Sequence, residues 1–179
     1  MAAVCRCVAG AARRRRGFLV AALVAGCGYN TTGRSAANVG NIYIPFFKDE
    51  TSGERVPDLG TRLTDRVVLE FMRDKDIRVY QGEAERAHAD KELLGTVRRL
   101  TESVLTRTAE ETGEEYRVVV TCSIKYADVA TGDVVWQDGN VFGDGNYLLQ
   151  DGQPAFQQAV DEALAEIVNK ILDKTVRAW

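Results

Sequence analysis

The sequence predicts an α+β fold: a small mixed sheet of about four to five strands with two amphipathic helices packed on one face. Two stretches, 57–74 and 154–176, repeat apolar residues every three to four positions, as amphipathic helices do. Between them lie short segments that alternate apolar and polar residues or are rich in β-branched and aromatic side chains. The length of 179 residues and the hydrophobic fraction of 45% suit one globular domain. The expected order is β-α-β-β-β-β-α.

The first predicted strand covers residues 41–47, in which Ile, Tyr and Phe predominate. Pro45 lacks an amide donor and therefore belongs at an edge or near the end of this strand. Pro57 suits the first position of the first helix, which should end near Asp74. Its apolar stripe comprises Leu59, Leu63, Val67 and Phe71, widened by Val68 and Met72.

Three further strands are predicted before the last pair of elements. The first is short, at 77–80, and the second alternates weakly over 93–105, with Gly95 as a candidate bulge. The third, 116–126, alternates cleanly and should be buried on one face. That face comprises Tyr116, Val118, Val120, Cys122, Ile124 and Tyr126.

A hairpin turn at 130–133 leads into a short strand at 134–136. The glycine- and asparagine-containing stretch that follows, 138–152, is expected to be a loop. The last helix has the strongest periodicity in the chain. Its stripe comprises Phe156, Ala159, Val160, Ala163, Leu164, Ile167, Val168, Ile171 and Leu172.

The first 26 residues are predicted to be a lipoprotein signal peptide. Four consecutive arginines precede a short apolar run, and no acidic residue occurs in the segment. Val24-Ala25-Gly26-Cys27 has the form of a bacterial lipobox, in which the cysteine is acylated and becomes the new N-terminus. The run of arginines also fits a twin-arginine signal, so the general secretory and twin-arginine routes both remain open. Gly28 is not the aspartate that commonly retains lipoproteins in the inner membrane, which favours the outer membrane.

Residues 27–40 are predicted to be the lipidated N-terminus and a flexible tether, and 41–179 a single domain. The whole chain has a net charge of −3 from 23 basic and 26 acidic residues. Removal of 1–26 takes away five arginines, so the mature protein carries 18 basic groups against 26 acidic ones, or −8. This acidity argues against a nucleic-acid partner. With Cys27 acylated, Cys122 is the only remaining thiol, and no internal disulfide can form.

The sequence predicts no catalytic residues, no metal site and no cofactor. His88 is the only histidine and lies in a polar segment. Cys122 falls on the apolar face of a strand, where it behaves as a small hydrophobe rather than a nucleophile. The aromatic residues Trp136, Tyr43 and Phe46 could line a groove, but aromatic side chains in strands usually belong to the core.

Basic residues of the middle strands form the one candidate binding surface. Either they make a cationic patch in an otherwise acidic protein, or they are simply a solvated sheet face. The group comprises Arg98, Arg99, Arg107, Arg117 and Lys125.

Several short segments together resemble the lipopolysaccharide-assembly lipoprotein family (LptE-like). Their order and spacing, which span nearly the whole mature domain, carry the resemblance. They are Cys27-Gly28-Tyr29, the stretch 42–47 leading into Lys48-Asp49-Glu50-Thr51, Leu63-Thr64, Ala89-Asp90, Leu94-Gly95-Thr96-Val97, Tyr116-Arg117-Val118, Thr131-Gly132-Asp133-Val134-Val135-Trp136 and the alanine-rich last helix. Asp49 departs from the family, which often has asparagine there.

The resemblance implies a non-enzymatic outer-membrane lipoprotein, anchored by lipid and facing the periplasm. It implies partnership with the β-barrel that inserts lipopolysaccharide, which such proteins plug and help to assemble. Direct contact with lipopolysaccharide, an anionic lipid, would need a local basic patch. We expect Arg98, Arg99 and Arg107 to supply it, with Val104 and Leu105 as apolar neighbours.

A second class of protein shares some of these features. Lipoproteins that activate periplasmic cell-wall synthases or build secretion pores also begin with a strand ending in Pro-Phe, followed by a helix carrying Leu-Thr-Asp, here 63–65. The segment from Ala89 to Gly95 and the hairpin 116–136 favour the assembly family. A periplasmic hydrolase, the third alternative, lacks a nucleophile–base pair.

Overall fold

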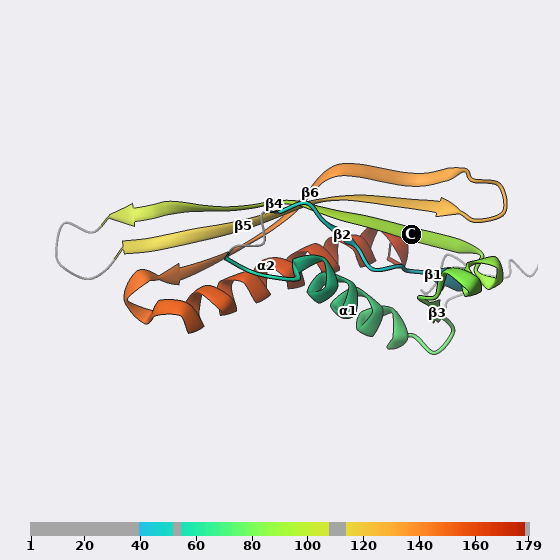
Figure 1. Cartoon of the computed structure of the whole chain (residues 1–179), viewed down its shortest axis with the longest axis horizontal. Coiled ribbons are helices and arrows are strands. Elements are labelled where there is room, and N and C mark those ends of the chain that lie inside the picture. The colour runs from blue at the N-terminus through green and yellow to red at the C-terminus, as the bar shows by residue number, and fades with distance from the viewer. Residues whose placement is uncertain (1–39, 52–54, 108–113, 178–179) are drawn as a thin grey trace, which may run out of the picture. The chain divides into compact units, whose positions relative to one another are not determined.

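The computed structural model describes residues 40–51, 55–107 and 114–177 (Figure 1). The predicted signal peptide, Cys27 and nearly all of the predicted tether lie outside these residues. A mixed six-stranded sheet runs in the order β3-β1-β4-β5-β6, and β2 pairs with β4. The strands are β1 (Asn41–Tyr43), β2 (Lys48–Asp49), β3 (Arg78–Tyr80), β4 (Lys91–Arg107), β5 (Glu114–Asp128) and β6 (Val134–Leu148).

Two helices, α1 (Leu59–Met72) and α2 (Gly152–Thr175), lie on the same face of the sheet (Figure 1). Short 3₁₀ segments, η1 (Glu83–His88) and η2 (Leu149–Asp151), precede β4 and α2. The predicted α+β class with two helices on one face of a mixed sheet is confirmed. The strand count is six rather than four to five, because the first predicted strand is divided in two.

Pro45 divides the first predicted strand. The ladder of β1 ends at Tyr43, and β2 forms only after the chain has shifted along β4, from Glu92 to Thr96. Ile44 still donates its amide to the carbonyl of Tyr80, whereas Pro45 has no amide to give. The prediction of one continuous strand over 41–47 was therefore wrong. Helix α1 also begins two residues later than predicted, because Asp58 takes a left-handed conformation with φ of 60°.

Thr64 ties the start of α1 to the segment before β2. Its fully buried hydroxyl donates to the carbonyl of Gly60 and accepts the amide of Phe47 at 2.9 Å. The Phe47 backbone thus gains a partner that no strand supplies.

Replacing Thr64 by valine should destabilise the domain by about 1–3 kcal/mol, because the shape is kept while the Phe47 amide is left buried without an acceptor. Urea denaturation would measure the loss. Thr64→Ser keeps the hydroxyl and should cost clearly less, and equal losses for the two variants would contradict this role.

Strand β5 confirms the alternation expected for 116–126. Val118, Val120, Cys122, Ile124 and Tyr126 are buried against the helices, and Tyr116 is half-buried. Strand β4 is longer than predicted and pairs with β5 over its whole length. Gly95 is not a bulge; its Cα instead lies beneath the ring of Phe47, where an added Cβ would come within 2.5 Å of the ring.

The largest error concerns residues 138–152, which were expected to be a loop. Strand β6 continues to Leu148, paired with β5 throughout. The glycines that suggest turns serve helix packing instead. A Cβ on Gly143 would lie 2.0 Å from the carbonyl oxygen of Ala163, and one on Gly145 would lie 2.1 Å from that of Ala159.

Helix α2 also covers the outer edge of β6. Glu166 accepts the backbone amide of Asp144 at 2.9 Å, and Lys170 donates to the carbonyl of Phe142 at 2.7 Å. Side chains of the helix thus occupy hydrogen-bonding groups that an unprotected edge strand would offer to another chain. The nine residues of the predicted stripe of α2 are all buried.

Candidate functional site

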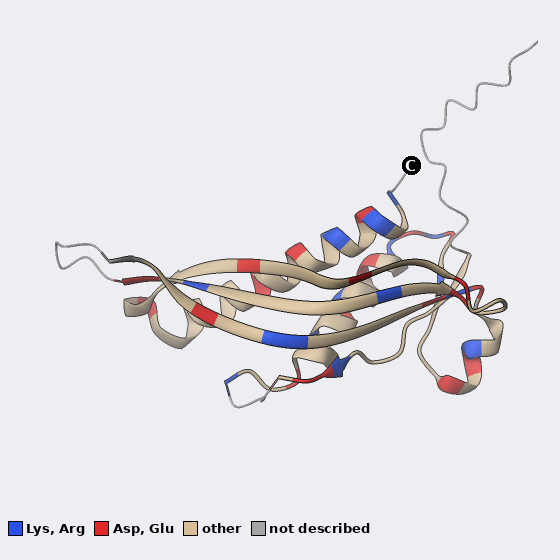
Figure 2. Cartoon of the chain, turned by 90° about the horizontal axis from the view of Figure 1, so that it is seen from above, with Lys and Arg blue, Asp and Glu red and all other residues tan. Residues whose placement is uncertain are grey.

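The two helices leave the other face of the sheet uncovered by any described element (Figure 1). Strands β4, β5 and β6 lie side by side on this open face, and charged residues of both signs are distributed along them (Figure 2). The basic residues predicted as a candidate patch belong to β4 and β5. Their positions on these strands decide which of them can act together.

Arg98 and Arg99 are neighbours that both reach solvent because of a bulge. Val97 pairs with Cys122 and Arg99 pairs with Thr121, so Arg98 is an extra residue in β4. In a regular strand, one of two successive side chains would point into the core. The bulge lets both arginines stay exposed, and neither has an ion pair within the described part of the chain.

Arg107 is not brought to this pair. It lies at the far end of β4, opposite Glu114. Eight residue steps from Arg99 at about 3.3 Å each place its backbone roughly 26 Å away along the strand. Val104 and Leu105 lie between them and are 39% and 47% exposed. The three arginines of the predicted patch therefore occupy two separate places along β4, one with Arg98 and Arg99 and the other with Arg107.

The two remaining basic residues, Arg117 and Lys125, differ in whether they form an ion pair with a described residue. Arg117 holds Asp144 on β6 through two contacts of 2.9–3.0 Å, and this carboxylate raises the pKa of its guanidinium. Lys125 lies opposite Leu94 on β4 and has no ion pair with a described residue. The sequence signal for the bulge in β4 is the pair of successive arginines, Arg98 and Arg99, because a half-buried strand normally alternates exposed and buried residues.

The residues set aside as non-catalytic occupy the expected environments. Cys122 is fully buried, and burial raises the pKa of its thiol to about 12, so it is inert at neutral pH. His88 is exposed at the end of η1. Among the described residues, no group of three or more His, Cys, Asp or Glu side chains is placed to hold a metal ion.

The three aromatic residues considered for a groove do not gather. Tyr43 is buried and donates its hydroxyl to Glu83 at 2.7 Å. Trp136 packs near Tyr126, with the ammonium of Lys174 5.5 Å from its ring, whereas Phe46 is 60% exposed elsewhere. Two of the three therefore support the core and its edge, as strand aromatics usually do.

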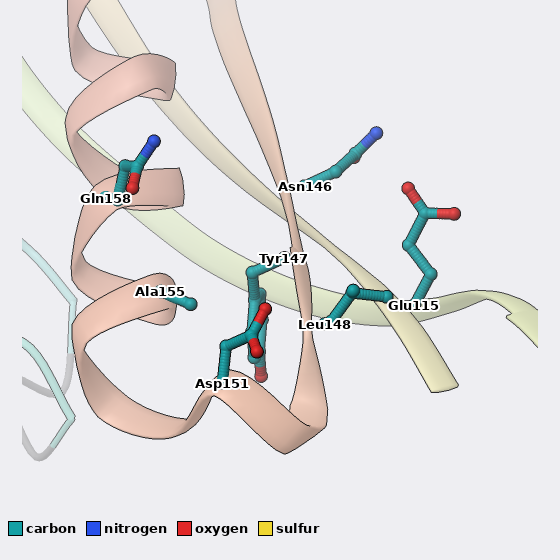
Figure 3. A pocket seen from close by; sticks show the side chains of 7 residues that line it. All are labelled: Glu115, Asn146, Tyr147, Leu148, Asp151, Ala155 and Gln158. Carbon is teal, nitrogen blue, oxygen red and sulfur yellow. The ribbon is translucent and has the colours of Figure 1, made fainter. Parts of the chain in front are cut away.

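A shallow pocket of about 260 Å³ lies where β6 passes through η2 into α2 (Figure 3). Asp151 and Tyr147 lie side by side at one end, and Glu115 approaches from β5 across Leu148. Asn146, Ala155 and Gln158 complete the lining. Carboxylates, amides and one phenol make this a polar surface depression without a nucleophile–base pair.

The described residues therefore present an open sheet face on which Arg98 and Arg99 are exposed. Comparison with known proteins shows which family the chain belongs to. Residues 39–175 match the family model LptE, described as lipopolysaccharide-assembly. The chain belongs to the lipopolysaccharide-assembly family. A comparison with curated proteins gave no significant match.

Solved structures with a similar fold include protein XCC0632 from Xanthomonas campestris, at 13% identity and a TM-score of 0.53, covering 76% of this chain and 84% of that one. A putative neuraminyllactose-binding hemagglutinin homolog from Helicobacter pylori is 12% identical, with a TM-score of 0.51 and coverage of 79% and 88%. The rare lipoprotein B from Shewanella oneidensis is 16% identical, with a TM-score of 0.45 and coverage of 71% and 90%. No helix in the described residues is long and apolar enough to span a membrane.

Proposed function

We propose that this member of the lipopolysaccharide-assembly family is a non-enzymatic lipoprotein of the outer membrane, which partners and plugs the β-barrel that inserts lipopolysaccharide. The family match over residues 39–175 is the observation that carries the proposal. Two features support it independently. The lipobox ending at Cys27 provides an anchor, and the folded domain offers a polar open sheet face suited to the polar interior of a barrel.

The anchor would act from the periplasmic side. Stable membrane attachment needs more than one acyl chain, and the diacylglycerol of a bacterial lipoprotein meets that need. Thirteen residue steps from Cys27 to Gly40 span at most about 45 Å, so the domain works close to the membrane that holds its lipid.

Affinity purification of the tagged protein from outer membranes in mild detergent tests the proposal. We expect a large β-barrel to be recovered at close to one copy per copy of this chain. Cys27→Ala should move the protein out of the membrane fraction and lower this recovery. Co-purification of a cell-wall synthase, or isolation of a ring of identical subunits, would instead assign the chain to the competing class of lipoproteins.

Direct contact with lipopolysaccharide is part of the proposal. Arg98 and Arg99 would hold one anionic group of the lipid, because they are successive, exposed residues of β4 and neither forms an ion pair with a described residue. Arg107 would form a second contact, about 26 Å along β4 from the first. Val104 and Leu105 provide the exposed apolar surface between them.

Reversing both charges, Arg98→Glu with Arg99→Glu, should weaken lipopolysaccharide binding by about tenfold or more and make the outer membrane permeable. The matched control is Lys75→Glu with Arg78→Glu, which makes the same charge change at two exposed residues near β3. Binding to purified lipopolysaccharide and sensitivity to large antibiotics would be measured. Equal effects of the two double variants would show that binding depends on the net charge of the protein and not on the position of Arg98 and Arg99. Arg107→Glu, tested alone, should have a smaller effect of its own.

A further inference from the structure

Two neighbouring valines, Val134 and Val135, are exposed at the start of β6, by 48% and 54%. They follow the turn that joins β5 to β6, and Val129 on the other side of that turn is half-buried. A register shift between Tyr126 and Ala127 makes Val135 an extra residue, so that both valines face solvent. We call residues 129–135 the hairpin end of the sheet.

The chain enters the domain beside the hairpin end. Asn41 and Asp90 exchange two hydrogen bonds, of 2.8 Å and 3.0 Å, and the carbonyl of Asp90 accepts the amide of Val129 at 3.0 Å. Gly40, the first described residue, directly precedes Asn41. It is therefore connected to the turn through the hydrogen bonds of Asp90. A lipid attached upstream of Gly40 would therefore tether the domain at this end of the sheet.

The length of the upstream segment decides which end can reach the membrane. The tether predicted from the sequence, from Cys27 to Gly40, would span on the order of 20 Å on average, and at most about 45 Å. Strand β4 starts next to β1 and has 17 residues, so its far end lies roughly 50 Å from the point of entry. If the far end of β4 touched the membrane with the strand upright, Gly40 would lie farther from the membrane than the fully stretched segment can reach.

From this geometry we infer that the hairpin end rests on the lipid surface in the anchored protein when no protein partner is bound, with Val134 and Val135 in contact with lipid. This inference rests on the proposed acylation of Cys27. Two valines are too small a surface to bind a membrane alone, but a short tether raises their effective concentration at the membrane to the millimolar range. Two carboxylates lie at this end. Asp128 pairs with Lys91 at 2.9 Å and accepts amides of its own turn, whereas Asp133, next to Val134, is exposed and stays in the aqueous headgroup layer when the valines touch lipid.

Environment-sensitive labels at the two ends of β6 test this orientation. Ala130→Cys places a nitrobenzoxadiazole label in the hairpin turn, and Gln150→Cys places it in η2, beyond the other end of the 15-residue strand. Both positions are exposed, and Cys122 stays unlabelled because it is fully buried. The mature acylated protein would be reconstituted into phosphatidylethanolamine–phosphatidylglycerol vesicles that contain a lipid-borne quencher.

We expect the label at residue 130 to be about twofold brighter on vesicles and strongly quenched by the lipid-borne quencher, and the label at residue 150 to be unaffected. Val134→Ser with Val135→Ser should abolish the change at residue 130. The matched pair, Leu148→Ser with Leu149→Ser, removes two apolar residues that are 36% and 50% exposed at the opposite end and should leave the change intact. Quenching at both ends, only at residue 150, or at neither end would overturn the inference.

Failure of the inference and failure of the proposed function are distinguishable. Mass spectrometry of the intact protein reports acylation, and flotation with vesicles reports anchoring. A protein that carries no lipid and does not float contradicts the proposed lipoprotein, whereas an acylated, floating protein without quenching at residue 130 contradicts only the orientation.

Discussion

Gly143→Ala is expected to destabilise the domain by about 3 kcal/mol. The added Cβ would lie 2.0 Å from the carbonyl oxygen and 2.9 Å from the carbonyl carbon of Ala163. These are backbone atoms in the middle of α2, so no side-chain rotation relieves the overlap. The helix must move away from the sheet and lose contacts along the buried stripe.

Gly139→Ala provides a control within the same strand. Nothing lies within 4 Å of a Cβ at that position, and the backbone there is not left-handed. The alanine should therefore be neutral or stabilise the fold by a few tenths of a kcal/mol, because it reduces the freedom of the unfolded chain. Urea denaturation of both variants gives the comparison. If the Gly143 variant were as stable as the Gly139 variant, α2 could not lie as close to β6 at Gly143 as it does in this structure.

Gly95→Ala is expected to cost about 2–3 kcal/mol through the ring of Phe47. The new Cβ would lie 2.5 Å from two ring carbons, and the ring itself is buried beside α1. Phe47→Ala alone should cost about 3–5 kcal/mol, because it leaves a cavity in the core.

The double variant separates this contact from general damage. If the ring is what an alanine at residue 95 strikes, Gly95→Ala should cost much less in the Phe47→Ala background. The coupling between the two substitutions should then be about 1–3 kcal/mol. Strictly additive losses in urea denaturation would mean that Gly95 is required for its backbone conformation and not for the space beneath the ring.

The sequence predicts most of the secondary structure because each of those elements carries its own periodicity. The stripes of Leu59, Leu63, Val67 and Phe71 in α1, and of Phe156 to Leu172 in α2, are all buried as expected. The alternation along β5 likewise matches its burial pattern. For these segments the local pattern of side chains and the demands of the tertiary core agree.

The second half of β6 could not be predicted in the same way. Glycine and asparagine favour turns when only neighbours in the chain are considered, and 139–146 contains both. Two of these glycines, Gly143 and Gly145, are there because α2 approaches the strand through Ala163 and Ala159, 20 and 14 residues later. A contact of that kind depends on two segments meeting in space, which the local sequence does not encode.

The candidate lipopolysaccharide contact is likewise predicted in part by the local sequence and decided in part by the tertiary structure. The sequence singles out Arg98, Arg99 and Arg107 as basic residues of the middle strands, but the grouping depends on a bulge. The extra residue in β4 keeps Arg98 and Arg99 together at the surface, and the extended backbone separates Arg107 from them. The register against β5 decides this, and register follows from pairing over the whole hairpin.

The sequence by itself determined the family resemblance, the two helices and the class of fold, and it predicts a lipobox at Cys27, since each depends on residue types at short, regular spacings. Only the tertiary structure decided how far β6 extends, which arginines are neighbours, and that the chain enters the domain beside Val134 and Val135. These features arise from hydrogen bonds and packing between distant parts of the chain, such as Asn41 with Asp90, 49 positions apart, and Gly143 with Ala163, 20 positions apart. Non-local contacts form only when the whole core assembles, which is why no local pattern in the chain announces them.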